Sequence, residues 1–268
     1  MRLPGATVLL TGATGGLGES VALALHRSGA QLILTGRRTY RLEALAARTG
    51  ARTIGCDLGD RAAVRRLADE AGRVDVLIAN AGVPAGGVIG EQSVSDIDAA
   101  LEVNLRAPMV LARLLCEPMR SRGGGHIVFM SSLAGKAASP GGAVYSATKF
   151  GLRGFALGLR EDLHADGVGV SAVFPGFISE AGMFADSGTT LPRFVGTSTP
   201  GQVARAVLAA IERNRAEIDV APVGMRVGAQ LAGLLPGVAA RVQRRFGAAD
   251  MSAAVTNGQA RARASSSP

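Results

Sequence analysis

The chain has 268 residues, of which 47% are hydrophobic, 4% are aromatic and 37 are Gly, a size and composition that suit one large α/β domain. Its two cysteines, Cys56 and Cys116, exclude a disulfide-stapled scaffold and favour a reducing, cytoplasmic compartment. The net charge of +8 gathers in residues 220–268, which hold six Arg and one Asp, and the few aromatic residues argue against a nucleic-acid partner.

Short apolar runs alternate with longer helical segments along the chain. The first run, Thr7–Thr11, predicts a strand and not a signal peptide, and no stretch offers the roughly 20 apolar residues of a membrane-spanning helix. The predicted strands are Thr7–Thr11, Gln31–Thr35, Thr53–Cys56, Val74–Ala79, His126–Ser131, Val168–Phe174 and Glu217–Val220. The predicted helices lie at about 16–28, 39–49, 60–71, 96–121, 145–165 and 199–214. This order predicts a Rossmann-like α/β fold, a doubly wound parallel sheet of about seven strands with helices on both faces.

The turn after the first strand is rich in glycine. It reads Thr11-Gly12-Ala13-Thr14-Gly15-Gly16-Leu17-Gly18 and leads into a helix. Glycine lets the backbone turn tightly and approach a pyrophosphate, whose charge then faces the helix N-terminus. No Gly-Lys-Ser/Thr follows, so this is not a P-loop. The turn predicts a dinucleotide site, and the alternative is a glycine-rich turn selected for packing alone.

The second strand indicates which dinucleotide. No Asp or Glu lies between Ser20 and Leu42, where an acid would bind a ribose 2′-hydroxyl, and the strand ends in Gly36-Arg37-Arg38. A guanidinium can bind a 2′-phosphate through two hydrogen bonds. We therefore expect NADP(H), with NAD(H) as the alternative if Arg37 and Arg38 are only solvated charges.

Polar residues also follow the third and fourth strands. Asp57 and Leu58 close the third, and Asn80, Ala81 and Gly82 close the fourth. Ligands of open parallel sheets bind at the carboxyl ends of the strands. Asp57 could accept a hydrogen bond from an adenine amino group or, alternatively, cap the 60–71 helix. Asn80 could tie neighbouring strand ends together.

Tyr145 and Lys149 are four residues apart and share one face of a predicted helix. A phenol ordinarily has a pKa near 10, and a neighbouring cation favours the phenolate, which tunes the group toward acid–base work. Ser131 and Ser132 end the buried strand upstream, and spacing makes Ser131 the bystander. Lys136, the only other lysine, is interpreted as a solvated loop charge.

Six motifs, taken in order, resemble the short-chain dehydrogenase/reductase family in its short single-domain branch. They are TGATGGLG, ANAG, the Asn of EVNL, IVFMSS, YSATK and FPG, within residues 5–176. The resemblance implies that Tyr145 exchanges a proton with the substrate oxygen and that Ser132 hydrogen-bonds this oxygen. It implies that Lys149 lowers the Tyr145 pKa and binds the nicotinamide ribose. Asn104 would hold a water molecule beside Lys149 or, alternatively, be an ordinary polar helix residue.

The resemblance also implies the contacts with the cofactor, and it implies no metal. The residues expected at the cofactor are Gly12, Thr14, Gly15, Gly16, Leu17, Gly18, Arg37, Arg38, Asp57, Leu58, Asn80, Ala81, Gly82, Tyr145, Lys149, Pro175, Gly176 and Ile178. The family often has a Thr shortly after Pro175-Gly176, but Ser179 is off by one position and Glu180 stands at the expected place. That contact stays open.

The segment 177–198 is rich in Gly, Ser and Thr and is predicted to be a mobile substrate lid, with Phe177, Met183 and Phe184 as an apolar wall or as ordinary core. We expect a catalytic domain at 1–222, an amphipathic helical extension at 223–250 and a disordered tail at 251–268. Two helices, 224–234 and 237–246, would pack over the substrate pocket or a neighbouring subunit. Alternatively, 223–246 makes a weak contact with a membrane surface.

The function expected from these features is an NADP-dependent oxidoreductase that interconverts a carbonyl and an alcohol on a small, apolar substrate. The alternative is a non-catalytic NADP-binding regulator, which would have no need of Ser132, Tyr145 and Lys149. The family often assembles as a homodimer or homotetramer, through helices that correspond to 96–121 and 145–165.

Overall fold

Seven parallel strands form a single sheet in the order β3-β2-β1-β4-β5-β6-β7. This is a computed structural model, and it describes residues 1–190, 195–245 and 247–266. The strands are β1 (Thr7–Thr11), β2 (Gln31–Gly36), β3 (Arg52–Gly55), β4 (Val76–Ala79), β5 (Gly125–Met130), β6 (Val168–Pro175) and β7 (Glu217–Val220). The order reverses between β1 and β4, where Val8 pairs with Val76. The predicted Rossmann-like α/β fold is confirmed, and the reversal is where such sheets bind ligands.

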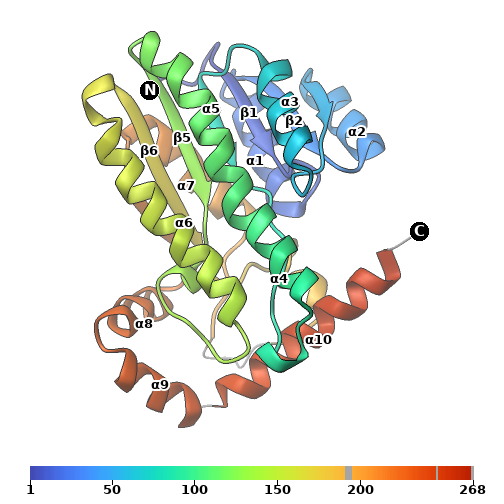
Figure 1. Ribbon diagram of the computed structural model, residues 1–268, viewed down its shortest axis with the longest axis vertical. Helices are drawn as coiled ribbons and strands as arrows, with labels where there is room; N and C mark the ends of the chain where they lie inside the picture. Colours follow the sequence, from blue (N-terminus) through green and yellow to red (C-terminus); the bar gives the residue numbers. More distant parts are fainter. Residues whose placement is uncertain (191–194, 246, 267–268) are drawn as a thin grey trace.

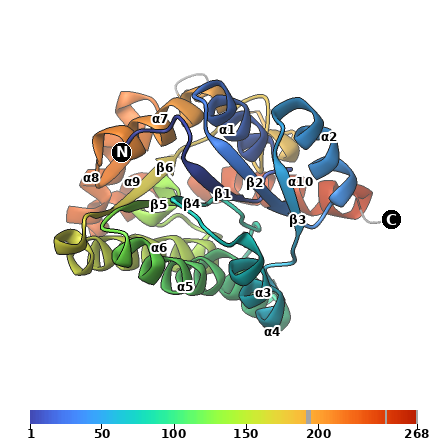
Figure 2. The ribbon, with the colours of Figure 1, turned by 90° about the horizontal axis from the view of Figure 1, so that it is seen from above.

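Helices cover both faces of the sheet (Figures 1 and 2). The main helices are α1 (Gly16–Arg27), α2 (Thr39–Thr49), α3 (Arg61–Ala71), α4 (Val94–Leu101), α5 (Ala107–Ser121), α6 (Ala143–Asp162) and α7 (Pro200–Arg213). One apolar core joins α1, α2 and α7 to one face, with Leu25 and Val207 fully buried. The other core joins α3, α5 and α6 to the opposite face around Leu111 and Phe129. Both strand faces are therefore buried, which is why β5 and β6 are almost entirely apolar, and their polar residues His126 and Ser171 are hydrogen-bonded to each other at 2.9 Å.

The predicted 96–121 helix is interrupted. α4 ends at Leu101, and a π-helical turn at Glu102–Arg106 precedes α5, which has Pro108 in its first turn. A π turn inserts one residue into the helix and has no signature in residue propensities, so the sequence predicted one continuous helix. Such turns often occur at functional sites, and this one carries Asn104.

Three further helices follow β7: α8 (Val223–Leu234), α9 (Pro236–Arg245) and α10 (Ala248–Ser266). The two short helices expected after Val220 are thus present, although residue 246 lies outside the described residues. The structure differs from the expected disordered tail, because α10 is a helix that packs on the 3₁₀ turn Ala185–Ser187. An ideal Cβ placed on Gly258 would overlap the Ser187 carbonyl oxygen, so only glycine permits this approach. The small residues of α10 that suggested disorder thus allow the helix to pack closely on the rest of the protein.

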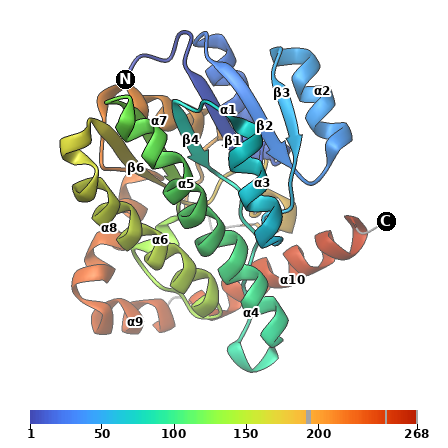
Figure 3. The same ribbon diagram turned by 45° about the horizontal axis from the view of Figure 1, so that its top comes forward.

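The last three helices lie together at the end of the molecule toward which the strands point (Figures 1 and 3). Among the residues that the structure describes, no helix combines the length and the apolar character needed to cross a membrane. Cys56 and Cys116 are buried and free, and burial raises the pKa of Cys56 to about 11, so its thiol is unreactive at neutral pH.

Candidate active site

The glycine turn lies at the carboxyl end of β1. An ideal Cβ on Gly12 would lie 2.7 Å from the Ala81 Cα, and one on Gly18 would overlap the Gly12 oxygen, so side chains are excluded at both positions. The first turn of α1 follows Gly15 without a side-chain cap. Its free N–H groups and the helix dipole favour an anion at this point.

The two arginines after β2 lie near this turn. The Arg38 guanidinium donates a hydrogen bond to the Thr14 carbonyl oxygen at 3.2 Å. The Arg37 side chain is exposed and has no hydrogen-bond or ion-pair partner among the described residues. One guanidinium is thus held over the turn and the other is available to a ligand, an arrangement that fits a 2′-phosphate.

Asn80 joins the ends of β1 and β4, as expected. Its side-chain amide donates to the Thr11 and Gly12 carbonyl oxygens at 3.0 and 3.2 Å. Asp57 is exposed and its Oδ1 accepts from the Gly59 N–H at 3.0 Å, in a local turn. The cap of α3 is Asp60, which accepts from the Ala62 N–H at 2.8 Å, so the capping interpretation of Asp57 is wrong. Asp57 therefore remains available at the strand edge.

Two of the expected cofactor residues point into the core. Leu58 and Ile178 are 7% and 4% exposed, and Ile178 also pairs with Ser198 in an isolated parallel bridge. Only their backbones could reach a cofactor. Leu17 and Ala81 are half-buried beside the turn, and Gly176 donates its N–H to the Val220 oxygen at 3.0 Å. This bond fixes the backbone after Pro175 to the edge strand β7.

Ser132 caps the short 3₁₀ turn Leu133–Gly135 that follows β5. Its hydroxyl accepts from the Ala134 N–H at 3.2 Å and donates weakly to the Pro175 oxygen at 3.4 Å. Ser131 is buried, and its hydroxyl donates to the Lys149 carbonyl oxygen at 3.2 Å. Ser131 is therefore structural, whereas Ser132 faces the phenol of Tyr145.

Tyr145 and Lys149 lie on the same side of the first turns of α6. The Lys149 Nζ lies 5.6 Å from the centroid of the Tyr145 ring and donates to the Met130 carbonyl oxygen at 3.0 Å. Burial raises the pKa of Tyr145 to about 12, and the interaction with the Ser132 hydroxyl works in the opposite direction. Burial lowers the pKa of Lys149 to about 8. The phenol is thus a poor acid by itself, and it needs further positive charge to become one.

Asn104 lies in the π turn beside this group and is only 1% exposed. Its side chain forms two hydrogen bonds with Val83, accepting from the N–H at 2.7 Å and donating to the oxygen at 2.9 Å. An ideal Cβ on Gly82 would lie 3.2 Å from the Asn104 Oδ1 and 3.8 Å from the Lys149 Nζ. Gly82 therefore separates Asn104 from Lys149, and a side chain here would crowd both.

Lys136 is not a solvated loop charge, which corrects the interpretation drawn from the sequence. Its Nζ lies 2.6 Å from Asp219 Oδ1, 2.9 Å from Glu217 Oε2 and 4.1 Å from the centroid of the Phe174 ring, and its side chain is 6% exposed. Arg153 binds the same Glu217 carboxylate through two hydrogen bonds of 2.6 and 3.1 Å. The alternation Glu217-x-Asp219 places both acids on one face of β7. This pattern was the signal in the sequence that could have identified them as partners of a buried cation.

The segment after Ile178 lies directly on the site. An ideal Cβ on Gly16 would overlap the Ala181 Cβ, and one on Gly82 would lie 3.4 Å from the Met183 Cε. Phe177 and Phe184 are half-buried, and the centroids of their rings lie 4.9 Å apart. Met183 thus lies beside Asn104 and Lys149, and it belongs to the site. Residues 191–194 of the predicted lid lie outside the described residues.

The segment 179–184 thus forms a cover over the site, and it is shaped by Glu180 and held by α10. The Ser179 hydroxyl donates to the Ser198 oxygen at 3.3 Å, and Glu180 adopts a φ of 71°, in the left-handed region that non-glycine residues rarely occupy. From α10, the Gln259 side chain donates to the Met183 oxygen at 3.1 Å. The sequence did not reveal this contact, because nothing near Gln259 indicates a partner almost eighty positions away.

The residues at this edge of the sheet therefore fit a dinucleotide. Glycine is required at Gly12 and Gly18, the N–H groups of α1 have no side-chain cap, and Arg37 and Asp57 are accessible on either side.

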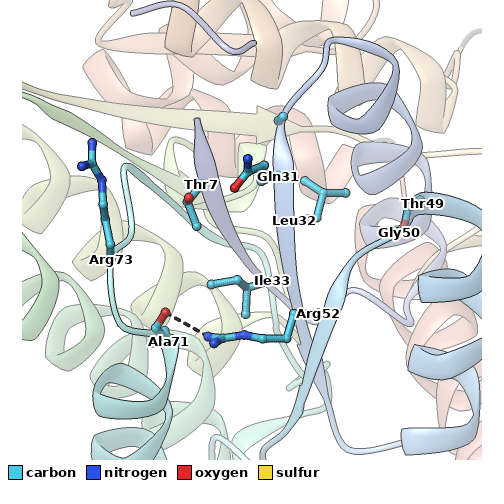
Figure 4. Close-up of a pocket in the computed structure, with 10 residues that line it drawn as sticks. Thr7, Gln31, Leu32, Ile33, Thr49, Gly50, Arg52, Ala71 and Arg73 are labelled. Carbon is cyan, nitrogen blue, oxygen red and sulfur yellow. Dashed lines mark hydrogen bonds between the residues drawn. The ribbon is translucent and has the colours of Figure 1, made fainter. Parts of the chain in front are cut away.

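A separate cavity of about 480 Å³ lies at the opposite edge of the sheet, between the amino ends of β1, β2 and β3 (Figure 4). Its lining combines apolar groups with the polar side chains of Thr7, Gln31, Thr49, Arg52 and Arg73, and Arg52 donates to the Ala71 oxygen at 2.9 Å. It holds no acid–base pair.

Comparisons with known proteins point the same way. A family profile described as short chain dehydrogenase matches residues 6–191. The ketoacyl reductase HetN of a Nostoc species is 39% identical over 228 residues, which cover 81% of this chain and 79% of that protein. The 3-oxoacyl-[acyl-carrier-protein] reductase FabG of Rickettsia conorii is 33% identical over 178 residues, 66% of this chain and 74% of that protein.

A solved structure gives the same result. The short-chain dehydrogenase from Sphingobium yanoikuyae in complex with NADPH superimposes with a TM-score of 0.76 at 29% identity. The match covers 87% of this chain and 94% of that chain. The similarity therefore extends beyond the glycine turn and includes nearly the whole sheet.

Proposed function

The chain belongs to the short-chain dehydrogenase family, and on this basis we propose that it is an NADP-dependent oxidoreductase that interconverts a carbonyl and an alcohol. The observation that carries the proposal is the cluster at the carboxyl edge of the sheet. There Ser132 faces the Tyr145 phenol, and the buried Lys149 ammonium lies 5.6 Å from the centroid of the same ring. A group of this composition suits proton transfer to or from a substrate oxygen.

Each residue has a distinct role in the proposed reaction. Ser132 donates to the substrate oxygen and holds it beside Tyr145. Tyr145 gives a proton to this oxygen during reduction and removes it during oxidation. Lys149 stabilises the phenolate, because a cation favours the charged form. Asn104 fixes the backbone of Val83 next to Lys149 and would hold the water molecule through which protons reach solvent.

The cofactor would lie along the carboxyl ends of β1 to β6 and supply or accept the hydride. Gly12, Gly16 and Gly18 would receive the pyrophosphate at the start of α1, and Thr14, Gly15 and Leu17 complete the turn. Arg37 and Arg38 would bind the 2′-phosphate, and Asp57 the adenine. Lys149 would hold the nicotinamide ribose, with Asn80, Ala81, Gly82, Pro175 and Gly176 around it. The structural relative from Sphingobium yanoikuyae was solved in complex with NADPH, which supports this choice of cofactor.

The substrate is proposed to be a carbonyl compound with an apolar body. Phe177, Met183 and Phe184 supply half-buried apolar surface, and Met183 lies beside Lys149. Two relatives are named as ketoacyl reductases, so 3-ketoacyl thioesters are the first candidates. The test follows NADPH oxidation with a panel of ketones, aldehydes and 3-ketoacyl thioesters. A chain that binds NADPH but turns over none of them would be the non-catalytic regulator.

Assembly and location follow as lesser proposals. Phe150 and Leu157 lie seven positions apart on α6 and are 41% and 40% exposed, and Gly154 between them has open space above it. We place a homodimer or homotetramer contact on this face of α5 and α6, with the protein in the cytoplasm, where its two free thiols stay reduced.

Replacing both Arg37 and Arg38 with Ala should raise the KM for NADPH about tenfold to hundredfold, because each removes hydrogen bonds from a charged donor to a phosphate. The KM for NADH, which lacks that phosphate, should change less than threefold. Arg213→Ala is the control, since Arg213 is exposed at the end of α7, next to the amino end of β7 and away from the glycine turn. A wild-type preference for NADH would refute the assignment.

Lys149→Arg should lower kcat by about tenfold to hundredfold although the charge is kept. The Lys149 ammonium is buried and donates to the Met130 oxygen at 3.0 Å, where a broad guanidinium does not fit. Because the pKa of Lys149 is about 8, the wild-type kcat should fall above about pH 8 as the cation is lost. Arg keeps its proton there, so the variant should show a low kcat without that fall. A variant with wild-type kcat and an unchanged pH profile would contradict this role.

A further inference from the structure

The outer face of α8 and α9 carries an unpartnered apolar stripe. It consists of Val227, Leu231, Leu234, Leu235, Val238 and Val242, each between 49% and 76% exposed. These are six of the fifteen large hydrophobic side chains that are exposed within the described ranges. Val227, Leu231 and Leu234 follow helical spacing on α8, and Val238 and Val242 follow it on α9. Each of the two helices therefore exposes its apolar side chains along one face.

The opposite face of the same helices rests on the candidate active site. Met225 packs on the apolar core next to Gly176, where an ideal Cβ would lie 3.4 Å from the Met225 Cε. An ideal Cβ on Gly233 of α8 would lie 3.4 Å from the Lys136 carbonyl oxygen. From α9, the Gln243 side chain donates to the Ala138 oxygen at 2.9 Å. The inner face thus holds the loop between Ser132 and Tyr145, and the stripe is turned away from the protein.

The charges beside the stripe have one sign. The sequence from 223 to 245 contains Arg226, Arg241, Arg244 and Arg245 and no Asp or Glu. The last three are exposed at the end of α9, and the described residues provide them with no salt bridge. A second copy of this surface would bring these guanidinium groups near one another, whereas an anionic surface would be attracted to them.

We infer that the stripe docks on the surface of an anionic lipid bilayer. An amphipathic helix pair with Val and Leu on one side and Arg at its border inserts its apolar side at the headgroup boundary without spanning the membrane. Each guanidinium near an anionic surface strengthens binding about fivefold, so the three at the end of α9 contribute about a hundredfold. In the docked protein, the loop between Ser132 and Tyr145 lies just behind the helices that contact the membrane.

Binding is measured by flotation of the full-length protein with vesicles, without cofactor or substrate, so the result does not depend on the proposed reaction. Vesicles of equal parts phosphatidylglycerol and phosphatidylcholine are compared with phosphatidylcholine alone. We expect binding to the first and little to the second, and weaker binding at high salt. Arg241→Gln/Arg244→Gln/Arg245→Gln should weaken it about a hundredfold. Leu231→Gln/Leu234→Gln/Leu235→Gln should abolish it.

Two matched triple variants serve as controls. Arg65→Gln/Arg213→Gln/Arg215→Gln removes the same charge from exposed positions elsewhere, and Val88→Gln/Ile89→Gln/Val94→Gln removes equally exposed apolar groups elsewhere. Both should bind like the wild type. Equal losses in the controls, or no binding of the wild type to anionic vesicles, overturn the proposal. It is also overturned if the leucine triple splits an oligomer in sedimentation velocity while vesicle binding is unchanged, since a second copy then covers the stripe.

Discussion

Replacing Tyr145 with Phe should lower kcat by about a factor of 10²–10⁴ and leave the fold intact. The change removes one hydroxyl and retains the ring, so the packing of α6 is preserved. Burial holds the pKa of this phenol near 12, and the interaction with Ser132 opposes this effect. Together with the Lys149 cation and the bound nucleotide, that interaction makes proton transfer possible near neutral pH. Without the hydroxyl the substrate oxygen has no proton donor.

The measurement is kcat for NADPH oxidation with the best carbonyl substrate, alongside thermal unfolding and NADPH binding. Tyr40→Phe is the matched control, because Tyr40 is the only other tyrosine and is 64% exposed on α2. That variant should keep wild-type turnover. If Tyr145→Phe also kept it, Tyr145 would not be the acid, and the non-catalytic interpretation or another donor would have to be considered.

Lys136→Met should destabilise the fold by about 3–5 kcal/mol, the usual loss when one partner of a buried ion pair is removed. The ammonium lies within 2.9 Å of both Glu217 and Asp219, which are largely buried on β7. After its removal Arg153 still pairs with Glu217, whereas Asp219 keeps a buried charge without a cation. Met fills much of the same volume, so the loss reports the charge and not a cavity.

Chemical denaturation of the two proteins at pH 7 gives the difference. Asp219→Asn in the Lys136→Met background is the informative control, because it removes the carboxylate that has lost its cation and should recover part of the lost stability.

The stability difference should also depend on pH. Burial raises the pKa of Glu217, but hydrogen bonds from Arg153 and Lys136 outweigh this effect and hold the pKa below its ordinary value of 4.5. The stabilisation from this carboxylate is therefore present above about pH 4.5 and lost at lower pH. The gap between wild type and Lys136→Met should narrow in acid. A loss below about 1 kcal/mol at pH 7 would contradict the buried network.

The sequence predicted the sheet well because most of its strands are short apolar runs between turns. The glycine turn at Gly12 and the i, i+4 pair of Tyr145 and Lys149 were also accessible, since both depend on local spacing. The same local reasoning missed the π turn around Asn104, because a π turn requires one extra residue and no particular residue type. It failed at Lys136 because its partners Glu217 and Asp219 lie some eighty residues away on the edge strand. Charge in a loop looks solvated until the tertiary neighbours are known.

The order in which the chain is synthesised gives the contact between α10 and Met183 a further meaning. Every residue of the proposed catalytic group, from the glycine turn to Pro175, precedes α10 in the sequence, and domains fold from the N-terminus as they emerge. The sheet through β6 can thus form before Gln259 exists to bond the Met183 oxygen. A nascent or truncated chain that ends before Ala248 carries a complete catalytic group under an untethered cover. For heterologous production, a fusion partner attached after α10 would lie at the end of the very helix that holds this cover in place.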